Sequence, residues 1–355
     1  MKVRFIGSMP SSGYSGGRLL ALGMAESLAL KGVNVEFLTN NHPIMMEEFK
    51  SFSRIDLKVV NFKNLDQYLN SRVDHLIIIP QQGEIKLHKR WALHGQKLDT
   101  KIHLLNFESA NWFNEVSPDK KNPKLWDGWV EVSKTCNSII SISKEGNKYA
   151  KEFYNNVRSD CEFTAIYPGI NSIKADSVTQ MDKKKQILFV TRIDPHKGFN
   201  MLEPFLTDEL NGYTLIIVVG SGGFPFLEKI RWKRKFKKYG LSLKIIHRIG
   251  SQEKFKLIKE SAVLYFPTKF EGFGLPPLEA AYCKTACACS DLSVLQEFGQ
   301  KAFNYGNTNV VLSMRNAIIQ ALKSQEKINL EWPRISKIAK MEEWGKRQDD
   351  FLQNI

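Results

Sequence analysis

Short apolar runs alternate with longer stretches of helical periodicity along the first half of the chain. We expect strands at Val3–Ile6, Val35–Thr39, His75–Pro80, Ile102–Phe107 and Ser138–Ser143. Each run is short and mostly apolar, as strands buried on both faces of a parallel sheet are. A helix should follow the first strand and end near Gly32. This alternation predicts a parallel sheet covered by helices on both faces.

A second series of the same kind begins after a break in the pattern. The turn Tyr167–Asn171 and the polar stretch to Lys185 interrupt regular structure, because Pro and Gly break helices and strands. Further strands are expected at Gln186–Val190, Thr214–Val219, Lys244–His247, Val263–Phe266 and Thr285–Ala288. The chain is therefore predicted to be an α/β protein with two Rossmann-like doubly wound domains, residues 1–168 and 169–332, facing a cleft.

The end of the chain shows one more helical pattern. Ile335, Ile338 and Met341 recur at helical spacing after Pro333, and Trp332 is a candidate anchor. We expect a helix over residues 333–355 that crosses back to the first domain.

Composition supports a folded protein in contact with phosphates. At 355 residues the chain exceeds what one hydrophobic core usually supports, which agrees with two domains. The net charge of +14 favours nucleic acid, anionic lipid or nucleotide as a partner without choosing among them.

Neither targeting nor disulfide signals stand out. No apolar run approaches the roughly 18 residues that a membrane span needs, and the first apolar run reads as a buried strand. The five cysteines are an odd set without a Cys-x-x-C pair, which argues against a disulfide framework or a zinc site. We therefore expect a cytoplasmic protein with reduced cysteines.

Ligands of doubly wound sheets bind beyond the carboxyl ends of the strands, so the loops there are the candidate sites. The loop after the first strand, Gly7–Gly17, opens into a helix with Gly16 and Gly17 at its end. Glycines let the backbone approach an anion, and a helix start offers unpaired N–H groups. A plain flexible loop is the alternative, because the spacing is not Gly-x-Gly-x-x-Gly.

The loop Thr191–Gly198 carries two cations. Arg192 and Lys197 stand five residues apart between a strand and a helix, where Arg offers a fork of donors and Lys a point charge to a diphosphate. A solvated turn is the alternative, since Asp-Pro and Lys-Gly are common turn sequences.

The segment Phe270–Ala281 is the most specific. Pro277 suits the first turn of a helix, so the N–H groups of residues 273–275 should converge just before it. Glu271 and Glu279 flank this anion cradle. Glu279 has an alternative role, because carboxylates are favoured in a first turn by the helix dipole alone.

Together these motifs resemble a known family. Glu271-x7-Glu279, Arg192-x4-Lys197 and the Gly16-Gly17 loop are similar to those of the retaining GT-B glycosyltransferases of family 4, group 1, which include sucrose-phosphate and phosphatidylinositol mannosyl transferases. Tyr167–Asn171 resembles that family's interdomain turn. The resemblance implies transfer of a sugar from a nucleoside diphosphate sugar, bound by residues 169–332, to a glycan, lipid-linked or small-molecule acceptor on the side of residues 1–168.

The resemblance also implies roles for single residues. Arg192 and Lys197 would neutralise the leaving diphosphate, Glu271 would face the transferred sugar, and Glu279 would bind the ribose hydroxyls. The donor contacts would be completed by Gly16, Gly17, Gly220, Arg248, Ile249, Gly272, Phe273, Gly274 and Leu275. No cofactor is implied, and a metal should not be required because Arg and Lys take its place; no Asp-x-Asp pair occurs in a comparable loop.

One departure from the family concerns a His that usually follows the strand read here as Ile102–Phe107. His103 lies too early, inside the strand, where a packed imidazole is expected. Asn106 and Glu108 are the polar residues nearest the end of this strand and become the catalytic candidates on the acceptor side. Trp112 and Asn114 would line the acceptor site, with a core role for Trp112 as the alternative.

Two basic clusters remain, Lys229–Lys238 around Trp232 and Lys86–Lys101 around Trp91. They favour an anionic membrane surface at the inner face of the membrane as a further partner, although a charge run is often only a solvated helix face. Other functions considered are a sugar-nucleotide epimerase, a phosphorylase of the same fold, and a nucleic-acid-binding protein. The last would have no use for the paired motifs, so nucleic acid is not an expected partner.

Overall fold

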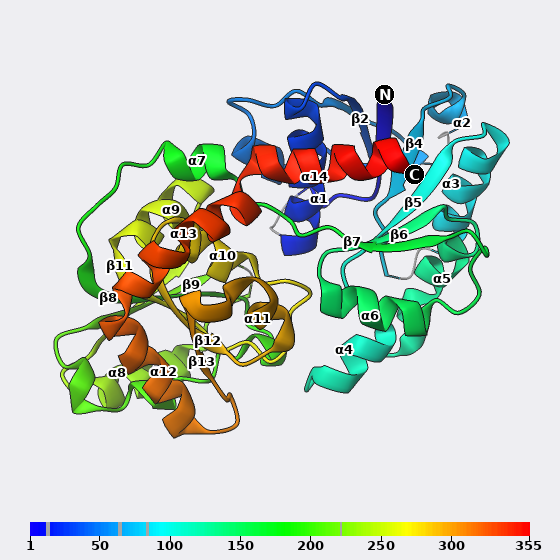
Figure 1. Cartoon of the computed structure of the whole chain (residues 1–355). Helices are drawn as coiled ribbons and strands as arrows, with labels where there is room; N and C mark the ends of the chain where they lie inside the picture. Colours follow the sequence, from blue (N-terminus) through cyan, green and yellow to red (C-terminus); the bar gives the residue numbers. More distant parts are fainter. Residues whose placement is uncertain (12–14, 63–65, 83–84, 221) are drawn as a thin grey trace. The chain divides into compact units, whose positions relative to one another are not determined.

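The computed structural model describes residues 1–11, 15–62, 66–82, 85–220 and 222–355 (Figure 1). The chain divides into two compact units. Unit 1 comprises Met1–Glu115, Lys120–Gly169 and Lys340–Ile355, and unit 2 comprises Val116–Asp119 and Ile170–Ala339. Positions 12–14 of the first glycine-rich loop lie outside the described residues.

Unit 1 is built on a parallel sheet whose strand order is β3-β2-β1-β4-β5-β6-β7. The strands are β1 (Lys2–Ile6), β2 (Asn34–Thr39), β3 (Asp56–Val59), β4 (His75–Ile78), β5 (Lys101–Asn106), β6 (Ser138–Ser141) and β7 (Glu162–Ala165). The helices are α1 (Gly16–Leu30), α2 (Asp66–Leu69), α3 (Ile85–Lys97), α4 (Ala110–Val116), α5 (Asp127–Ser133), α6 (Lys144–Phe153) and α14 (Met341–Asn354). The predicted strands are present, and the edge strands β3 and β7 are additional.

Unit 2 repeats the plan with a parallel sheet of order β10-β9-β8-β11-β12-β13. Its strands are β8 (Lys184–Thr191), β9 (Thr214–Val219), β10 (Ser242–His247), β11 (Ser261–Phe266), β12 (Ala286–Ser290) and β13 (Phe303–Gly306). Its helices are α7 (Ser172–Asp176), α8 (Phe226–Lys237), α9 (Ser251–Glu260), α10 (Leu275–Tyr282), α11 (Ser293–Gly299), α12 (Val311–Lys323) and α13 (Gln325–Ala339). The prediction of an α/β fold with two Rossmann-like parallel sheets is confirmed.

The end of the chain differs from the predicted helix that begins at Pro333. Pro333 lies inside α13, which begins at Gln325 and belongs to unit 2. The helix ends at Ala339, and α14 begins two residues later in unit 1. There it packs on α1, where the Gln348 side chain donates a hydrogen bond to the Ser27 hydroxyl at 2.7 Å. A proline costs one backbone hydrogen bond inside a helix, and α13 tolerates that loss.

Candidate functional site

The predicted donor-binding residues other than Gly16 and Gly17 lie at one edge of the sheet in unit 2 or near it. Strands β10, β9, β8 and β11 are neighbours and run parallel, so their carboxyl ends meet at the same edge. The loops after these four strands carry Arg248 and Ile249, Gly220, Arg192 to Gly198, and Glu271 to Leu275, in that order. This edge is where doubly wound folds bind ligands.

The loop after β8 is shaped by Gly198. This residue has a φ of 66°, and a Cβ there would lie only 2.1 Å from the carbonyl oxygen of Pro267 in the loop after β11. Only glycine accepts both conditions. Arg192 on the same loop is two-fifths exposed and forms an ion pair with Asp194 at 3.2 Å. Its guanidinium therefore remains accessible to a ligand at the edge of the sheet.

Lys197 and Glu271 directly connect the loop after β8 with the loop after β11. The Lys197 ammonium lies 2.7 Å from the Glu271 carboxylate, and the two side chains are only 17% and 13% exposed. A charge held this far from water needs a partner, and each supplies the other. The structure thus pairs Lys197 of the predicted Arg192-x4-Lys197 motif with Glu271 of the predicted Glu271-x7-Glu279 motif.

His196 connects the same loops through its backbone. Its carbonyl oxygen accepts hydrogen bonds from the Lys269 N–H at 2.7 Å and the Thr268 hydroxyl at 3.0 Å. Its ring Nδ1 lies 2.9 Å from the carboxylate of Asp119, in the short segment that belongs to unit 2. Burial lowers the pKa of His196, while the hydrogen bond to Asp119 opposes that shift. No role for His196 or Asp119 could be predicted from the sequence, because the two residues are far apart along the chain.

The start of α10 forms the predicted cradle. Gly274 precedes the helix with a φ of 107°, and Pro276 and Pro277 follow in its first turn, where missing N–H groups cost nothing. The Phe273 ring is buried and stacks on Phe298 with ring centroids 4.5 Å apart. This anchor fixes the backbone of residues 273–275, including that of Leu275, at the open edge.

Glu279 has a partner that sequence reasoning missed. The predicted first-turn position is wrong, because α10 begins at Leu275 and Glu279 follows in the next turn. The dipole alternative is correspondingly weak. Its carboxylate instead meets the Lys254 ammonium of α9 at 2.6 Å, with side chains 7% and 17% exposed. Lys254 stands four residues after Gly250, in the helix that follows the predicted donor contacts Arg248 and Ile249, and this position is the one signal that could have found it.

Two other donor candidates are backbone positions. The Gly220 N–H donates to the Thr191 carbonyl at 2.9 Å, which ties the ends of β9 and β8 together. Arg248 has a φ of 50°, and its N–H donates to the Val219 carbonyl at 3.2 Å. Both therefore shape the edge of the sheet, and the half-buried Ile249 follows the exposed Arg248. Within the described residues, no group of three or more His, Cys, Asp or Glu side chains is arranged to hold a metal ion.

On the acceptor side, Asn106 is a structural residue. It is 1% exposed at the end of β5. Its amide nitrogen donates to the Ser141 hydroxyl at 3.1 Å, and its oxygen accepts from the Tyr154 hydroxyl at 3.1 Å. The predicted catalytic role is therefore wrong, because both ends of the amide already serve the core. Glu108, two residues later, is half-buried and stays a candidate.

Trp112 and Asn114 on α4 also serve the fold. Trp112 is 2% exposed and stacks on Tyr149 with ring centroids 5.7 Å apart, so the core alternative replaces the predicted sugar-stacking role. The Asn114 amide donates to the Lys121 carbonyl at 2.8 Å and accepts from the Lys121 N–H at 2.8 Å. It clamps the following loop, and this use of both amide ends replaces the predicted acceptor contact.

Gly16 and Gly17 stand at the start of α1. A Cβ at Gly16 would meet nothing within 4 Å, whereas one at Gly17 would touch the Phe107 ring at 3.8 Å. The open space at Gly16 is compatible with a ligand at this helix start.

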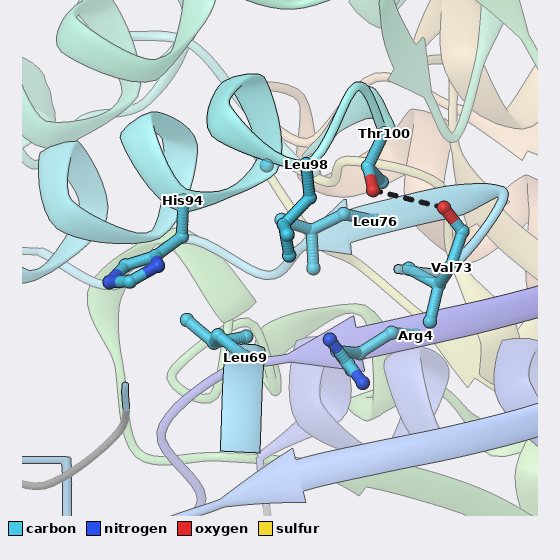
Figure 2. A pocket seen from close by; sticks show the side chains of 8 residues that line it. Arg4, Leu69, Val73, Leu76, His94, Leu98 and Thr100 are labelled. Atoms are coloured by element: carbon cyan, nitrogen blue, oxygen red, sulfur yellow. Dashed lines mark hydrogen bonds between the residues drawn. The ribbon is translucent and has the colours of Figure 1, made fainter. Parts of the chain in front are cut away.

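A pocket elsewhere in unit 1, between β1, β4 and α3, holds none of the candidate residues (Figure 2). It is lined by Arg4, Leu69, Val73, Leu76, His94, Gly95, Leu98 and Thr100.

Comparison with known proteins identifies the domain that carries this edge. Residues 172–330 match the family model described as glycosyl transferases group 1. Unit 2 thus matches a group 1 glycosyltransferase domain over these residues. The prediction of a glycosyltransferase enzyme is confirmed over residues 172–330, whereas family 4 and the retaining mechanism stay predictions.

The chain is also similar to individual proteins. It is 26% identical over 186 residues to the O-antigen chain mannosyltransferase RfbU of Salmonella typhimurium, a match that spans 52% of this chain and 51% of that protein. The chain thus matches about half the length of this curated relative. Its fold resembles that of HepE from Anabaena in complex with UDP-glucose, with a TM-score of 0.74, 12% identity and full coverage of both chains.

A second solved structure supports the same fold. Sucrose-phosphate synthase from Thermosynechococcus elongatus aligns with a TM-score of 0.69 and 14% identity over 99% of this chain and 98% of that one. At such identities the likeness concerns the fold alone. Among the described helices, none has the length and apolar character needed to cross a bilayer.

Proposed function

We propose that the chain is a retaining glycosyltransferase that moves a hexose from a nucleoside diphosphate sugar to an acceptor. The observation that carries the proposal is the edge of unit 2, where Arg192, Lys197 and Glu271 converge in a group 1 glycosyltransferase domain. The structure of HepE with UDP-glucose makes a uracil nucleotide sugar the first donor to test.

The chemistry follows from these residues. Arg192 and Lys197 stabilise the charge that grows on the departing diphosphate, a contribution that often dominates catalysis. The N–H groups at the start of α10 add a positive dipole end. With these cations in place the reaction proceeds without a resident metal or cofactor. Glu271 faces the sugar, and Glu279, held by Lys254, accepts hydrogen bonds from the ribose hydroxyls.

The acceptor side is proposed from the relative that builds O-antigen chains and from the position of Glu108. The relative that builds O-antigen chains favours a glycan acceptor, carried by a lipid, for this chain as well. Such an acceptor would be met at the inner face of the membrane by a cytoplasmic enzyme bound there peripherally. Glu108 would orient the acceptor hydroxyl beside the leaving phosphate, and alignment of this kind is worth several kcal/mol.

Ligand-induced stabilisation tests the donor site first. Thermal unfolding is measured with UDP, GDP and ADP and with their hexose derivatives, because at equal concentration a tighter ligand raises the melting temperature more. The best donor is then incubated with lipid-linked oligosaccharide acceptors, and NMR of the product reads the anomeric configuration. Inversion would refute the retaining mechanism. Change of the donor sugar without any acceptor would indicate an epimerase instead.

A further inference from the structure

Helix α8 presents two different faces. Trp232 and Phe236, one turn apart, are buried, and the Phe236 ring lies against Phe205 with centroids 6.2 Å apart. The outward face carries the exposed cations Arg231, Lys233, Arg234, Lys237 and Lys238. Glu228, the sole carboxylate in α8, forms an ion pair with Arg231 at 3.2 Å. The outer face is therefore strongly positive.

The first turn of α8 is exposed and apolar. Phe226 is 72% exposed and Leu227 is 77% exposed, and they are adjacent in the chain. Single exposed apolar residues are ordinary on protein surfaces. A solvated basic helix, however, gains nothing from two large apolar side chains held together in water. Nucleic acid would use the cations but would leave Leu227 without a partner. An anionic bilayer uses both, because apolar side chains enter the acyl boundary while cations meet the headgroups.

The topology places the first turn of α8 at the edge of the unit 2 sheet that carries the predicted donor loops. We call this edge the donor edge. α8 follows β9, whose carboxyl end at Val219 lies between those of β8 and β10. The helix therefore begins on the same edge of the sheet as Arg192 and Lys197. A membrane bound at Phe226 and Leu227 would lie beside the loops that we assign to the donor.

We propose that Phe226 and Leu227 insert into an anionic membrane surface and that the outer cations of α8 hold its headgroups. The consequence for catalysis, delivery of a lipid-linked acceptor to the donor edge, rests on the proposed function; the membrane contact itself does not. Binding weakens with salt, since the cations supply an electrostatic part that ions screen.

Vesicle sedimentation tests the contact. The protein is spun with vesicles of phosphatidylglycerol and phosphatidylcholine, and with phosphatidylcholine alone, at low and high salt. The double variant Phe226→Ser and Leu227→Ser should weaken binding to the anionic vesicles by about tenfold or more. Its matched control is Leu330→Ser, because Leu330 is 81% exposed on α13 in the same unit. The control should bind like the wild type.

A charge-matched pair tests the electrostatic part. Lys233→Gln with Lys237→Gln should weaken binding by roughly tenfold, and Lys301→Gln with Lys323→Gln, which removes the same charge from exposed sites elsewhere in unit 2, should have a much smaller effect. Equal losses in both pairs would overturn the proposal, since only net charge would then matter. Unchanged binding of the Phe226 and Leu227 variant would overturn it too, as would binding to duplex DNA with no binding to vesicles.

Stabilisation by the donor nucleotide, measured on the same variants, separates this proposal from the proposed function. The surface variants should keep the nucleotide-induced shift in melting temperature while their binding to vesicles is weakened. A wild-type protein that binds vesicles through Phe226 and Leu227 but ignores every sugar nucleotide would refute the transferase proposal and leave the membrane contact standing.

Discussion

The Lys197 ammonium lies 2.7 Å from the Glu271 carboxylate, and this contact joins the loops that follow the neighbouring strands β8 and β11. A diphosphate bound near Lys197 would compete with Glu271 for the ammonium. As Lys197 turns to the phosphate, the carboxylate becomes available to the hydroxyls of the sugar. Under the proposed function, the pair would therefore link binding of the donor phosphates to positioning of the sugar.

Lys197→Ala should lower turnover by about two to three orders of magnitude, because it removes a cation from the leaving diphosphate. Arg192→Ala should act in the same direction. Both variants should remain folded, as circular dichroism would show, and Lys301→Ala serves as an exposed control in the same unit. Steady-state transfer from the best donor is the measurement. Near wild-type rates in both variants would refute the donor-site assignment.

Glu279→Gln should raise the dissociation constant of the nucleoside diphosphate by about tenfold, because the ribose loses a charged acceptor. Lys254→Met should weaken binding as well, since Lys254 holds the carboxylate at 2.6 Å. Titration calorimetry measures both. If the two variants lower the melting temperature of the free protein but leave nucleotide affinity unchanged, the pair is purely structural.

Asn106 and Glu108, near the end of β5, should respond differently to substitution, because Asn106 supports the fold and Glu108 is proposed to act on the acceptor. Asn106→Ala should reduce the free energy of unfolding by about 1–3 kcal/mol, since the Ser141 and Tyr154 hydroxyls lose a buried partner. Glu108→Gln should leave that free energy nearly unchanged and impair transfer to the acceptor more than donor binding. Denaturant unfolding and initial transfer rates distinguish them. Normal transfer by Glu108→Gln would mean that the acceptor is oriented from elsewhere.

The sequence predicts that the loops carrying Arg192, Lys197 and Glu271 lie at one edge of the unit 2 sheet, because parallel strands bring loops distant in the chain to one place. The positions of Arg192, Lys197 and Glu271 follow from where each strand ends, and their meeting follows from strand order. The edge strands β3 and β7 escape prediction because they are short, partly exposed and lack an apolar run.

Side-chain partners are harder to predict than loops. Nothing in the local pattern indicates that Asp119 meets His196, and only the position of Lys254 in the helix after Gly250 hints at its contact with Glu279, because each pair joins separate elements. Trp112 illustrates the opposite error. A tryptophan near a strand end fits a sugar-stacking role or a core role equally well, and only the burial of its ring decides.

A buried pair of histidines in unit 1 makes the fold sensitive to acid. The His75 Nδ1 lies 2.9 Å from the His103 Nε2, and the His103 Nδ1 lies 2.7 Å from the Ser138 hydroxyl oxygen. Burial lowers the pKa of His75 to about 4, with a smaller effect of Lys101 in the same direction and of Asp74 against it. Burial lowers the pKa of His103 well below its usual value, and His75 adds to that effect.

The stability of the protein should therefore fall as the pH drops from about 6.5 toward 4. In that window the unfolded chain binds protons at these rings and the folded chain does not, so acid favours unfolding. Full stability is present above pH 6.5, and His75 alone contributes about 3 kcal/mol to the loss. Denaturant unfolding at a series of pH values measures it. His75→Gln should reduce the dependence of stability on pH only in part, because buried His88 also has a pKa of about 4 and still contributes. The exposed His42→Gln is the control, and an equally steep dependence in His75→Gln would contradict the assignment.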